Sequence, residues 1–333
     1  MRTEVSKFAV HSATSLSHAI SLLSQYGQQA AVINGATDII SRNKNGIKLH
    51  MFQHLVDISG LALNYSNKKS DGWHIGAGTP INGVATNINL PTVLQQAAGA
   101  VATLQIRNMG TIAGDVLQEV WCPYLRNNFD CWRNGGNVCY GAIGDNRYYH
   151  SIFGGRLCYA NHAGDIAQAL FALGAKATIQ GSLGSRTVSM DTLMPGISII
   201  NGVVKENTVA QNEVLTEFII PNQPSGQVST YYKVRDRGTW DFALASAAVA
   251  LTISGSKASN TRIVLGGVDV IPHRSPAAEA KVDGQQLTED TFAKAGTAAV
   301  ADATPLTYGT GNAYRVQLAN GAVRKALRAI SQM

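Results

Sequence analysis

The sequence AAVINGATDI at residues 30–39 places a short apolar run directly before a glycine-containing turn. The run predicts a buried strand, and residues 39–45 after the turn predict a helix. Apolar side chains at helical spacing over residues 13–27 predict another helix, and residues 55–58 predict a second strand. We therefore expect residues 1–60 to form a unit of the βαβ type.

The turn at residues 33–38 is a candidate ligand-binding loop. Main-chain N–H groups in a turn between a strand and a helix can hold a diphosphate. Glycine turns after strands are common, however, and an ordinary connection is the simpler explanation of this turn by itself. A second segment, RNMGTIAGD at residues 107–115, offers a threonine hydroxyl and small residues where a backbone must approach a flat ligand.

The rest of the chain mixes short strands with short helices and shows no internal repeat. The run PNQPSG at residues 221–226 has two prolines, a glycine and no large apolar residue, so it predicts a linker. Beyond the linker, strands followed by helices predict an α+β domain. The expected strands are 73–78, 177–179, 218–220, 229–234, 242–254 and 262–265, and the expected helices are 92–102, 167–173, 289–302 and 313–330.

Composition limits the class of protein. The 333 residues suggest about two domains, and with 45% hydrophobic residues the chain can bury a core. No apolar stretch is long enough to span a bilayer, and the start lacks the apolar region of a signal peptide. The net charge of +6 is a mild bias that does not indicate nucleic-acid binding. Only 14% of residues are charged, which is typical of a surface that packs on partner subunits.

The cysteines are unevenly placed, because all four lie between residues 122 and 158. This window lacks the closely paired cysteines of most structural zinc sites. A [4Fe–4S] cluster accepts wider spacings, and the glycine and asparagine residues between the cysteines leave main-chain N–H groups free to bond cluster sulfurs. The spacing favours an iron–sulfur cluster and leaves a zinc site, two disulfides or free thiols open.

Two further segments have simple structural explanations. Residues 232–237, YKVRDR, lie on an expected strand of the C-terminal domain, where a solvated charged edge accounts for them. Residues 76–78, GAG, partly match a dinucleotide-binding fingerprint, but Pro80 and the missing third glycine indicate a turn at the end of a strand.

The segments occur together in an order that resembles the flavin-binding medium subunits of the molybdenum hydroxylases, the family of xanthine dehydrogenase, carbon monoxide dehydrogenase and aldehyde oxidoreductase. The first family loop, A-G-G-T-[DN]-[LI], is matched by residues 34–39, and the second, R-N-x-[GA]-T-[IT]-[GA]-G-N, by residues 107–115. In the C-terminal domain, Y-x-K-V-x-x-R is matched by residues 231–237 and L-G-G-V-x-x-x-P-x-R by residues 265–274. The resemblance covers about residues 5–330.

The cysteine window narrows the resemblance to a subgroup. Medium subunits of 4-hydroxybenzoyl-CoA reductase and of periplasmic aldehyde oxidoreductases carry an inserted loop that binds a [4Fe–4S] cluster in addition to FAD. Residues 117–124 and 158–165 look like the two ends of that insertion. The resemblance implies that the cluster ligands are Cys122, Cys131, Cys139 and Cys158.

The implied fold class is α+β: a two-subdomain FAD-binding fold of the PCMH type, followed by an α+β C-terminal domain like that of the CO dehydrogenase flavoprotein. The expected boundaries are 1–60 for the N-terminal subdomain, 61–222 for the second subdomain with a cluster loop at 117–165, and 227–333 for the C-terminal domain. The residues implied to bind FAD are Ile33, Asn34, Gly35, Ala36, Thr37, Asp38, Ile39, Arg107, Thr111, Ala113, Gly114, Asp115, Asp165 and Lys233. In this assignment Asp165 lies near the adenosine or ribityl hydroxyls, and Lys233 approaches the isoalloxazine ring.

By the resemblance, the chain is an electron-transfer subunit of an oxidoreductase whose substrate chemistry takes place on a partner. A small partner with two [2Fe–2S] clusters and a large partner with a molybdenum cofactor are implied, with FAD passing electrons to an external acceptor. The implied assembly is a heterotrimer or a dimer of heterotrimers. We expect it in the cytoplasm, with export to the periplasm beside a signal-bearing partner as the alternative.

Two other functions are compatible with the sequence. One is a degenerate medium subunit that binds no flavin and serves as an assembly scaffold. The other is a self-contained flavin oxidase, for which no His or Tyr constellation is visible.

Three residues depart from the family pattern. Asp115 stands where the family has Asn, and a carboxylate there repels a diphosphate unless Arg107 or a helix N-terminus compensates. Asn34 and Ala36 replace the usual Ala and Gly, which adds side-chain atoms near the first loop.

Overall fold

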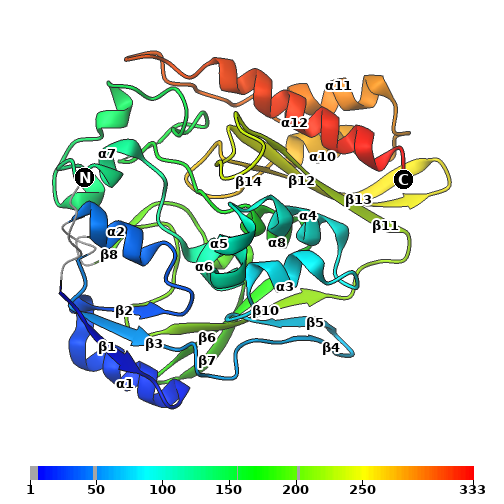
Figure 1. Ribbon diagram of the computed structural model, residues 1–333. Helices are drawn as coiled ribbons and strands as arrows, with labels where there is room; N and C mark the ends of the chain where they lie inside the picture. The colour runs from blue at the N-terminus through cyan, green and yellow to red at the C-terminus, as the bar shows by residue number, and fades with distance from the viewer. Residues whose placement is uncertain (1–6, 48–50, 156, 201–202) are drawn as a thin grey trace.

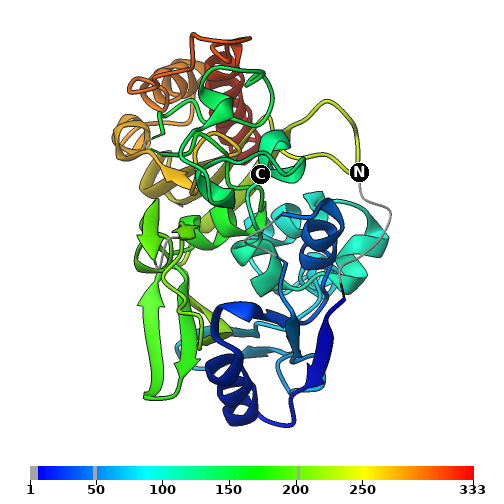
Figure 2. The same ribbon diagram turned by 90° about the vertical axis from the view of Figure 1, so that its left-hand side faces the viewer.

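The structure is a computed structural model that describes residues 7–333 except 48–50, 156 and 201–202. Three larger sheets and a two-stranded one organise these residues. In Figure 2 the N-terminal sheet lies near the bottom and the C-terminal helices lie at the top. The predicted α+β fold class is confirmed.

The N-terminal sheet is parallel, with strand order β1-β3-β2. Its elements are β1 (Ala9–Ser12), α1 (Leu16–Tyr26), β2 (Ala30–Ile33), α2 (Ile39–Asn45) and β3 (His54–Asp57). In the chain, β2 precedes α2 and β3 follows it, and the two strands pair in parallel. The predicted βαβ unit is therefore confirmed. Helix α1 begins after Ser15, whose side chain accepts a hydrogen bond from the His18 N–H, and ends at Gly27.

The second sheet is antiparallel, with strand order β4-β5-β10-β6-β7. Its strands are β4 (Ser66–Lys68), β5 (Gly72–Gly76), β6 (Lys176–Gly181), β7 (Gly184–Ser189) and β10 (Val214–Pro221). The helices of this region are α3 (Ile81–Thr86), α4 (Thr92–Ala100), α5 (Leu104–Met109), α6 (Ile112–Leu117), α8 (Ile166–Ala172) and α9 (Met190–Leu193). A short hairpin, β8 (Ser198–Ile200) and β9 (Val203–Lys205), precedes β10.

The C-terminal sheet has the strand order β11-β12-β13-β14 and is covered on both faces. Its elements are β11 (Gln227–Val234), β12 (Ala245–Ser254), β13 (Lys257–Gly266), β14 (His273–Arg274), α10 (Pro276–Val282), α11 (Glu289–Ala298) and α12 (Tyr314–Ile330). Along β12, Ala247 and Val249 belong to the core formed with α11 and α12, whereas Ala248 and Ala250 belong to the core formed with α4 and α8 of the preceding region. Figure 1 shows α11 and α12 on one side of this sheet and α4 and α8 on the other. The residues of the two sets alternate along the strand, and all of them are buried. This is the pattern of a strand that is covered on both faces.

The cysteine window runs over the surface with little regular structure. It contains α7 (Pro123–Arg126) and two 3₁₀ turns, Trp132–Asn134 and Tyr140–Ala142. Arg315, on α12, fixes the window to the C-terminal domain, because its buried guanidinium donates to the carbonyl oxygens of His150, Leu244 and Gly267. Within the described part of the chain, every helix is too short or too polar to cross a membrane.

Candidate functional site

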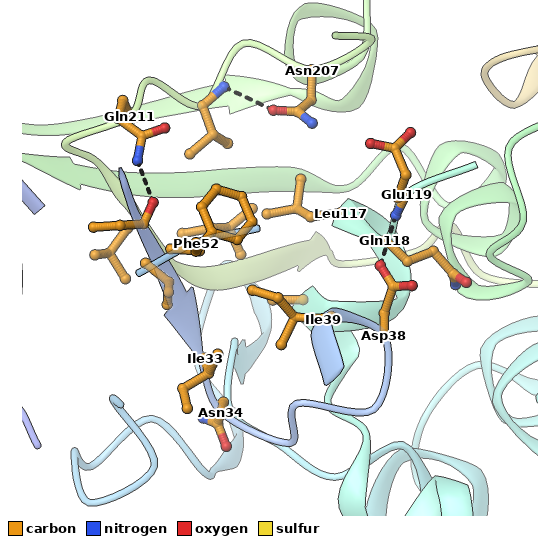
Figure 3. Close-up of a pocket in the computed structure, with 18 of the residues that line it drawn as sticks. Ile33, Asn34, Asp38, Ile39, Phe52, Leu117, Gln118, Glu119, Asn207 and Gln211 are labelled. Carbon is orange, nitrogen blue, oxygen red and sulfur yellow. Dashed lines mark hydrogen bonds between the residues drawn. The ribbon is translucent and has the colours of Figure 1, made fainter. Parts of the chain in front are cut away.

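A cavity of about 790 Å³ lies between the N-terminal sheet and the segment that leads into β10. Its walls come mainly from residues 28–39, from the region of residues 110–119 and from residues 204–215. Both apolar and polar side chains face it, and those labelled in Figure 3 are Ile33, Asn34, Asp38, Ile39, Phe52, Leu117, Gln118, Glu119, Asn207 and Gln211. The volume is in the range of pockets that take a ligand of substantial size.

The two predicted glycine-containing segments meet at this cavity. A Cβ atom placed on Gly35 would lie 1.9 Å from the carbonyl oxygen of Met109. Such a distance is impossible, so only glycine allows the loop at 33–39 to pack directly on the end of α5. The neighbouring Ala36 has φ of 55°, in the left-handed region where the family pattern has glycine.

The main-chain N–H groups of Gly35, Ala36 and Thr37 donate to no protein acceptor among the described residues. All three residues line the cavity. Successive free N–H groups on a turn form a cradle for an anionic oxygen. This wall therefore fits the diphosphate of a dinucleotide.

The start of α6 forms an adjoining part of the wall. Thr111 caps this helix, and its hydroxyl accepts a hydrogen bond from the Gly114 N–H at 3.2 Å. Thr111, Ala113 and Gly114 all line the cavity. Small residues here keep the wall close to the backbone, as the sequence predicts for an approach to a flat ligand.

Ten of the fourteen residues predicted to bind FAD thus line one cavity. They are Ile33, Asn34, Gly35, Ala36, Thr37, Asp38, Ile39, Thr111, Ala113 and Gly114. The other four, Arg107, Asp115, Asp165 and Lys233, are not among the residues that line it. Contact with FAD stays a prediction for all fourteen residues.

Lys233 and Asp165 form a buried ion pair where the C-terminal sheet meets α8. The Lys233 Nζ lies 2.6 Å from Asp165 Oδ2 and also donates to the Ala100 carbonyl oxygen at 3.2 Å. The Tyr231 hydroxyl donates to the other carboxylate oxygen of Asp165 at 2.5 Å. Burial and the charge of Asp165 raise the pKa of Tyr231 well above its usual value, so the phenol keeps its proton.

Asp115 lies beside this pair. Its carboxylate accepts hydrogen bonds from the Ile166 N–H at 2.9 Å and from the Gln118 side chain at 3.1 Å. Burial, with the nearby charge of Asp165, raises the pKa of Asp115 to about 7. Near neutral pH the side chain is thus partly uncharged, which reduces the repulsion that a carboxylate at this position exerts on a diphosphate.

Asp38 is the acidic residue of the first loop, and it is held by two arginines. Its carboxylate lies 2.9 Å from Arg126 and 3.1 Å from Arg42, and it accepts the main-chain N–H of Glu119 at 3.0 Å. Burial raises the pKa of Asp38, but the charges of Arg42 and Arg126 outweigh it and hold the pKa below its usual value. Figure 3 shows the bond between Asp38 and Glu119 at the edge of the cavity.

The four cysteines are linked to this edge of the cavity through Arg133, which donates to the Cys158 sulfur and to Glu119 of the cavity wall. Cys122, Cys131 and Cys158 are buried and Cys139 is half-buried, and none forms a disulfide. Cys158 is close enough to the other three to raise the pKa of each thiol electrostatically. Burial, the largest cause, raises the pKa of Cys122 to about 12, so this thiol keeps its proton at neutral pH.

Hydrogen-bond donors face each of the four sulfurs. Main-chain N–H groups approach the Cys122, Cys131 and Cys139 sulfurs and lower their pKa values against the effect of burial. The Cys158 sulfur accepts from the Ala160 N–H at 3.4 Å and from Arg133 Nε at 3.1 Å. Such donors are what the sulfurs of an iron–sulfur site require.

The window does not have the geometry of a single-ion site. Across the residues that the structure describes, no three His, Cys, Asp or Glu side chains are arranged to hold a metal ion. The four predicted cluster ligands are free thiols in the structure, and a cluster bound to them stays a prediction.

The far wall of the cavity could not be found from a sequence motif. Phe52, Asn207 and Gln211 lie far from both predicted loops in the chain, and Gln211 is fixed by hydrogen bonds to the carbonyl oxygens of Gly27 and Ala30. These residues reach the site through tertiary packing. A helical or glycine-loop pattern gives no signal for such contacts.

Comparison with known families covers nearly the whole chain. The family described as "FAD binding domain in molybdopterin dehydrogenase" matches residues 6–223. The family described as "CO dehydrogenase flavoprotein C-terminal domain" matches residues 230–330. The gap between the two matches falls on the predicted linker.

Individual relatives agree with these matches. The chain is 31% identical over 273 residues to the aldehyde oxidoreductase FAD-binding subunit PaoB of Escherichia coli, covering 79% of this chain and 82% of the relative. It is 26% identical over 329 residues to the carbon monoxide dehydrogenase medium chain of Hydrogenophaga pseudoflava, covering 97% and 96%. A solved structure of carbon monoxide dehydrogenase from that organism superposes with a TM-score of 0.75 at 25% identity over 98% of both chains.

Proposed function

The chain belongs to the family of FAD-binding medium subunits of the molybdenum hydroxylases, and from this premise we propose that it carries electrons between partner subunits and an external acceptor. The observation that carries the proposal is the cavity wall at residues 35–37, whose main-chain N–H groups have no protein acceptor in the described part of the chain. These residues line a space large enough for a dinucleotide. When bound, FAD supplies the conversion between one-electron and two-electron transfer.

The residues of the chain provide binding and orientation. The N–H groups of residues 35–37 would hold the diphosphate, and the Thr111 hydroxyl with the small residues that follow would let the ligand approach the backbone of α6. Apolar side chains such as Ile33, Ile39 and Phe52 would exclude water from the ligand. Lys233 and Asp165, from the predicted FAD set, would act from the junction with the C-terminal domain.

We also propose that Cys122, Cys131, Cys139 and Cys158 bind a [4Fe–4S] cluster. Support comes from the four free thiols, from the electrostatic effect of Cys158 on the other three and from the donors that face each sulfur. A bound cluster supplies one-electron transfer at the edge of the FAD cavity. The four side chains would lose their thiol protons on binding, and the N–H donors would hold the resulting thiolates.

The partners proposed are a small [2Fe–2S] subunit and a large subunit with the molybdenum cofactor. Relatives named as medium chains or as FAD-binding subunits of larger enzymes support this assembly. Substrate chemistry would take place on the large subunit. A scaffold without flavin is not favoured, because such a chain has no need of an open cavity with free N–H groups.

Gly35→Ala tests the FAD site. The added Cβ cannot fit against the Met109 carbonyl, so the loop must move. We expect the purified chain to lose at least tenfold in flavin occupancy, measured by acid extraction and visible absorbance. Gly60→Ala is the control, because a Cβ at Gly60 meets no atom within 4 Å. Full flavin occupancy in Gly35→Ala, or a wild-type chain without flavin, contradicts the proposal.

Cys139→Ser tests the cluster site. Loss of one of four thiolates should abolish the broad iron–sulfur absorbance and lower the iron content, while part of the flavin spectrum remains. Iron and acid-extracted flavin are counted in the same sample. A variant that retains its full iron content refutes the ligand assignment.

A further inference from the structure

Arg133 lies between the cavity and the cysteine window and contacts both. Its Nε donates to the Cys158 sulfur at 3.1 Å, Nη1 to Glu119 Oε1 at 2.8 Å and Nη2 to Glu206 Oε2 at 2.9 Å. The side chain is 2% exposed. Each of the three guanidinium nitrogens thus has a partner, and one of these partners is a predicted cluster ligand.

Both carboxylate partners belong to the cavity wall. Glu119 and Glu206 line the cavity, and the Glu119 main-chain N–H also bonds Asp38 of the first loop. The path from the cavity wall to a cysteine sulfur therefore consists of one carboxylate and one guanidinium. No other arginine or lysine side chain among the described residues has a hydrogen bond to a cysteine sulfur.

The arrangement fixes a positive charge against one sulfur. A guanidinium stays protonated in proteins, and its planar fork gives it a defined direction when two carboxylates hold it. A second cation, the buried Arg315, donates to the His150 carbonyl oxygen, and the His150 ring lies 3.5 Å from the Cys122 sulfur. Arg133 itself contacts both a predicted ligand and the cavity wall.

We propose that Arg133 sets the reduction potential of the metal group held by the four cysteines, and that Glu119 and Glu206 hold its guanidinium against Cys158. The inference rests on the proposed function. Reduction adds an electron to a group that already carries thiolate charge. A charge-assisted N–H···S bond stabilises the more negative state and so raises the potential.

The test is a redox titration of the assembled complex. Electron paramagnetic resonance of the iron–sulfur centres reports their reduction at each potential. Arg133→Gln removes the charge. We expect the equilibrium constant for reducing the cysteine-bound group to fall at least tenfold. For one electron, this lowers the reduction potential by about 59 mV. Arg274→Gln is the matched control, because Arg274 makes a similar two-bond pair with Glu279 in the C-terminal domain. It should leave the potential unchanged.

If Arg133→Gln fails to retain iron, a second variant tests whether Arg133 sets the reduction potential. Glu206→Gln removes one negative charge beside Arg133 but keeps an oxygen that can accept its hydrogen bond. It leaves all four cysteines intact and should shift the potential in the opposite direction, upward. An unchanged potential in an iron-replete variant overturns the inference. A wild-type complex that lacks the additional iron–sulfur centre contradicts the proposed cluster instead.

Discussion

Asp115 shows how a single buried carboxyl links the stability of the protein to pH. Burial and Asp165 raise its pKa from 3.8 to about 7 in the folded chain. Between these two values the folded state holds a proton that the unfolded state has released. The free energy of unfolding therefore falls as pH rises from about 4 to about 7, by up to about 1.4 kcal/mol per pH unit from this group.

Asp115→Asn should remove this contribution. An amide at this position keeps an oxygen for the Ile166 N–H but has no proton to lose. We expect the difference in free energy of unfolding between variant and wild type to grow with pH across this window, in favour of the variant. Chemical denaturation at several pH values measures it, with the exposed Asp302→Asn as control. A difference that stays constant with pH contradicts the protonation assigned to Asp115.

At the scale of elements, the ion pair of Lys233 and Asp165 joins strand β11 to the start of helix α8. Both side chains are about 5% exposed or less. Removing one partner of such a pair leaves a buried charge, which costs about 3–5 kcal/mol. Lys233→Met should therefore destabilise the protein by roughly that amount.

The double variant Lys233→Met with Asp165→Asn should recover most of the loss, because no unpaired charge is left. Thermal and chemical denaturation measure the loss of stability in the single variant and in the double variant. The predicted role beside FAD is separate: a variant at Lys233 should slow flavin reoxidation more than it lowers flavin occupancy. A single variant as stable as the wild type would show that the pair does not join the two elements.

Several elements could be predicted from the sequence because their apolar pattern is strong. Helices α1, α8 and α12 and the strand β12 lie where the spacing of apolar residues places them. The short strand β1 was not predicted, since most of its residues are exposed and no alternation marks it. Helices α5 and α6 were also missed. Each has six residues, and Gly110 and Thr111 separate them.

The candidate site was predictable in part for the same reason. Loops that must bring main chain close to main chain need glycine, so Gly35 marks the cavity in the sequence. The cysteines were also evident, because their clustering is a property of the chain. Glu206, Phe52 and Gln211 reach the cavity only through packing of distant segments, and their residue types carry no motif. The domain boundaries at 60 and 222 stay a prediction.

At the scale of the whole molecule, Arg315 fixes the cysteine window against the C-terminal domain. Burial lowers its pKa to about 10, and its partners are carbonyl oxygens of three separate segments. Arg315→Met would leave the Leu244 and Gly267 carbonyls without this donor, each at a cost of about 1–3 kcal/mol, whereas the His150 carbonyl keeps a bond from Asn312 Nδ2.

We expect Arg315→Met to destabilise the protein by at least about 2 kcal/mol and to expose residues 117–165 to proteases. Limited proteolysis with mass spectrometry locates the cuts. Lys325→Met on the same helix is the control, because Lys325 is exposed and should change stability by less than about 0.5 kcal/mol. An equally resistant Arg315→Met would show that the window is held by other contacts.

The covered C-terminal sheet has a consequence for any attempt to divide the protein. Residues 221–226 have the composition of a linker, yet one face of the sheet beyond them packs on α4 and α8, which precede the linker. A fragment that starts at residue 227 would present Tyr231, Ala248, Ala250 and Val264 to water. Expression of either half alone should therefore give aggregated material, and the halves should become soluble only when they are produced together.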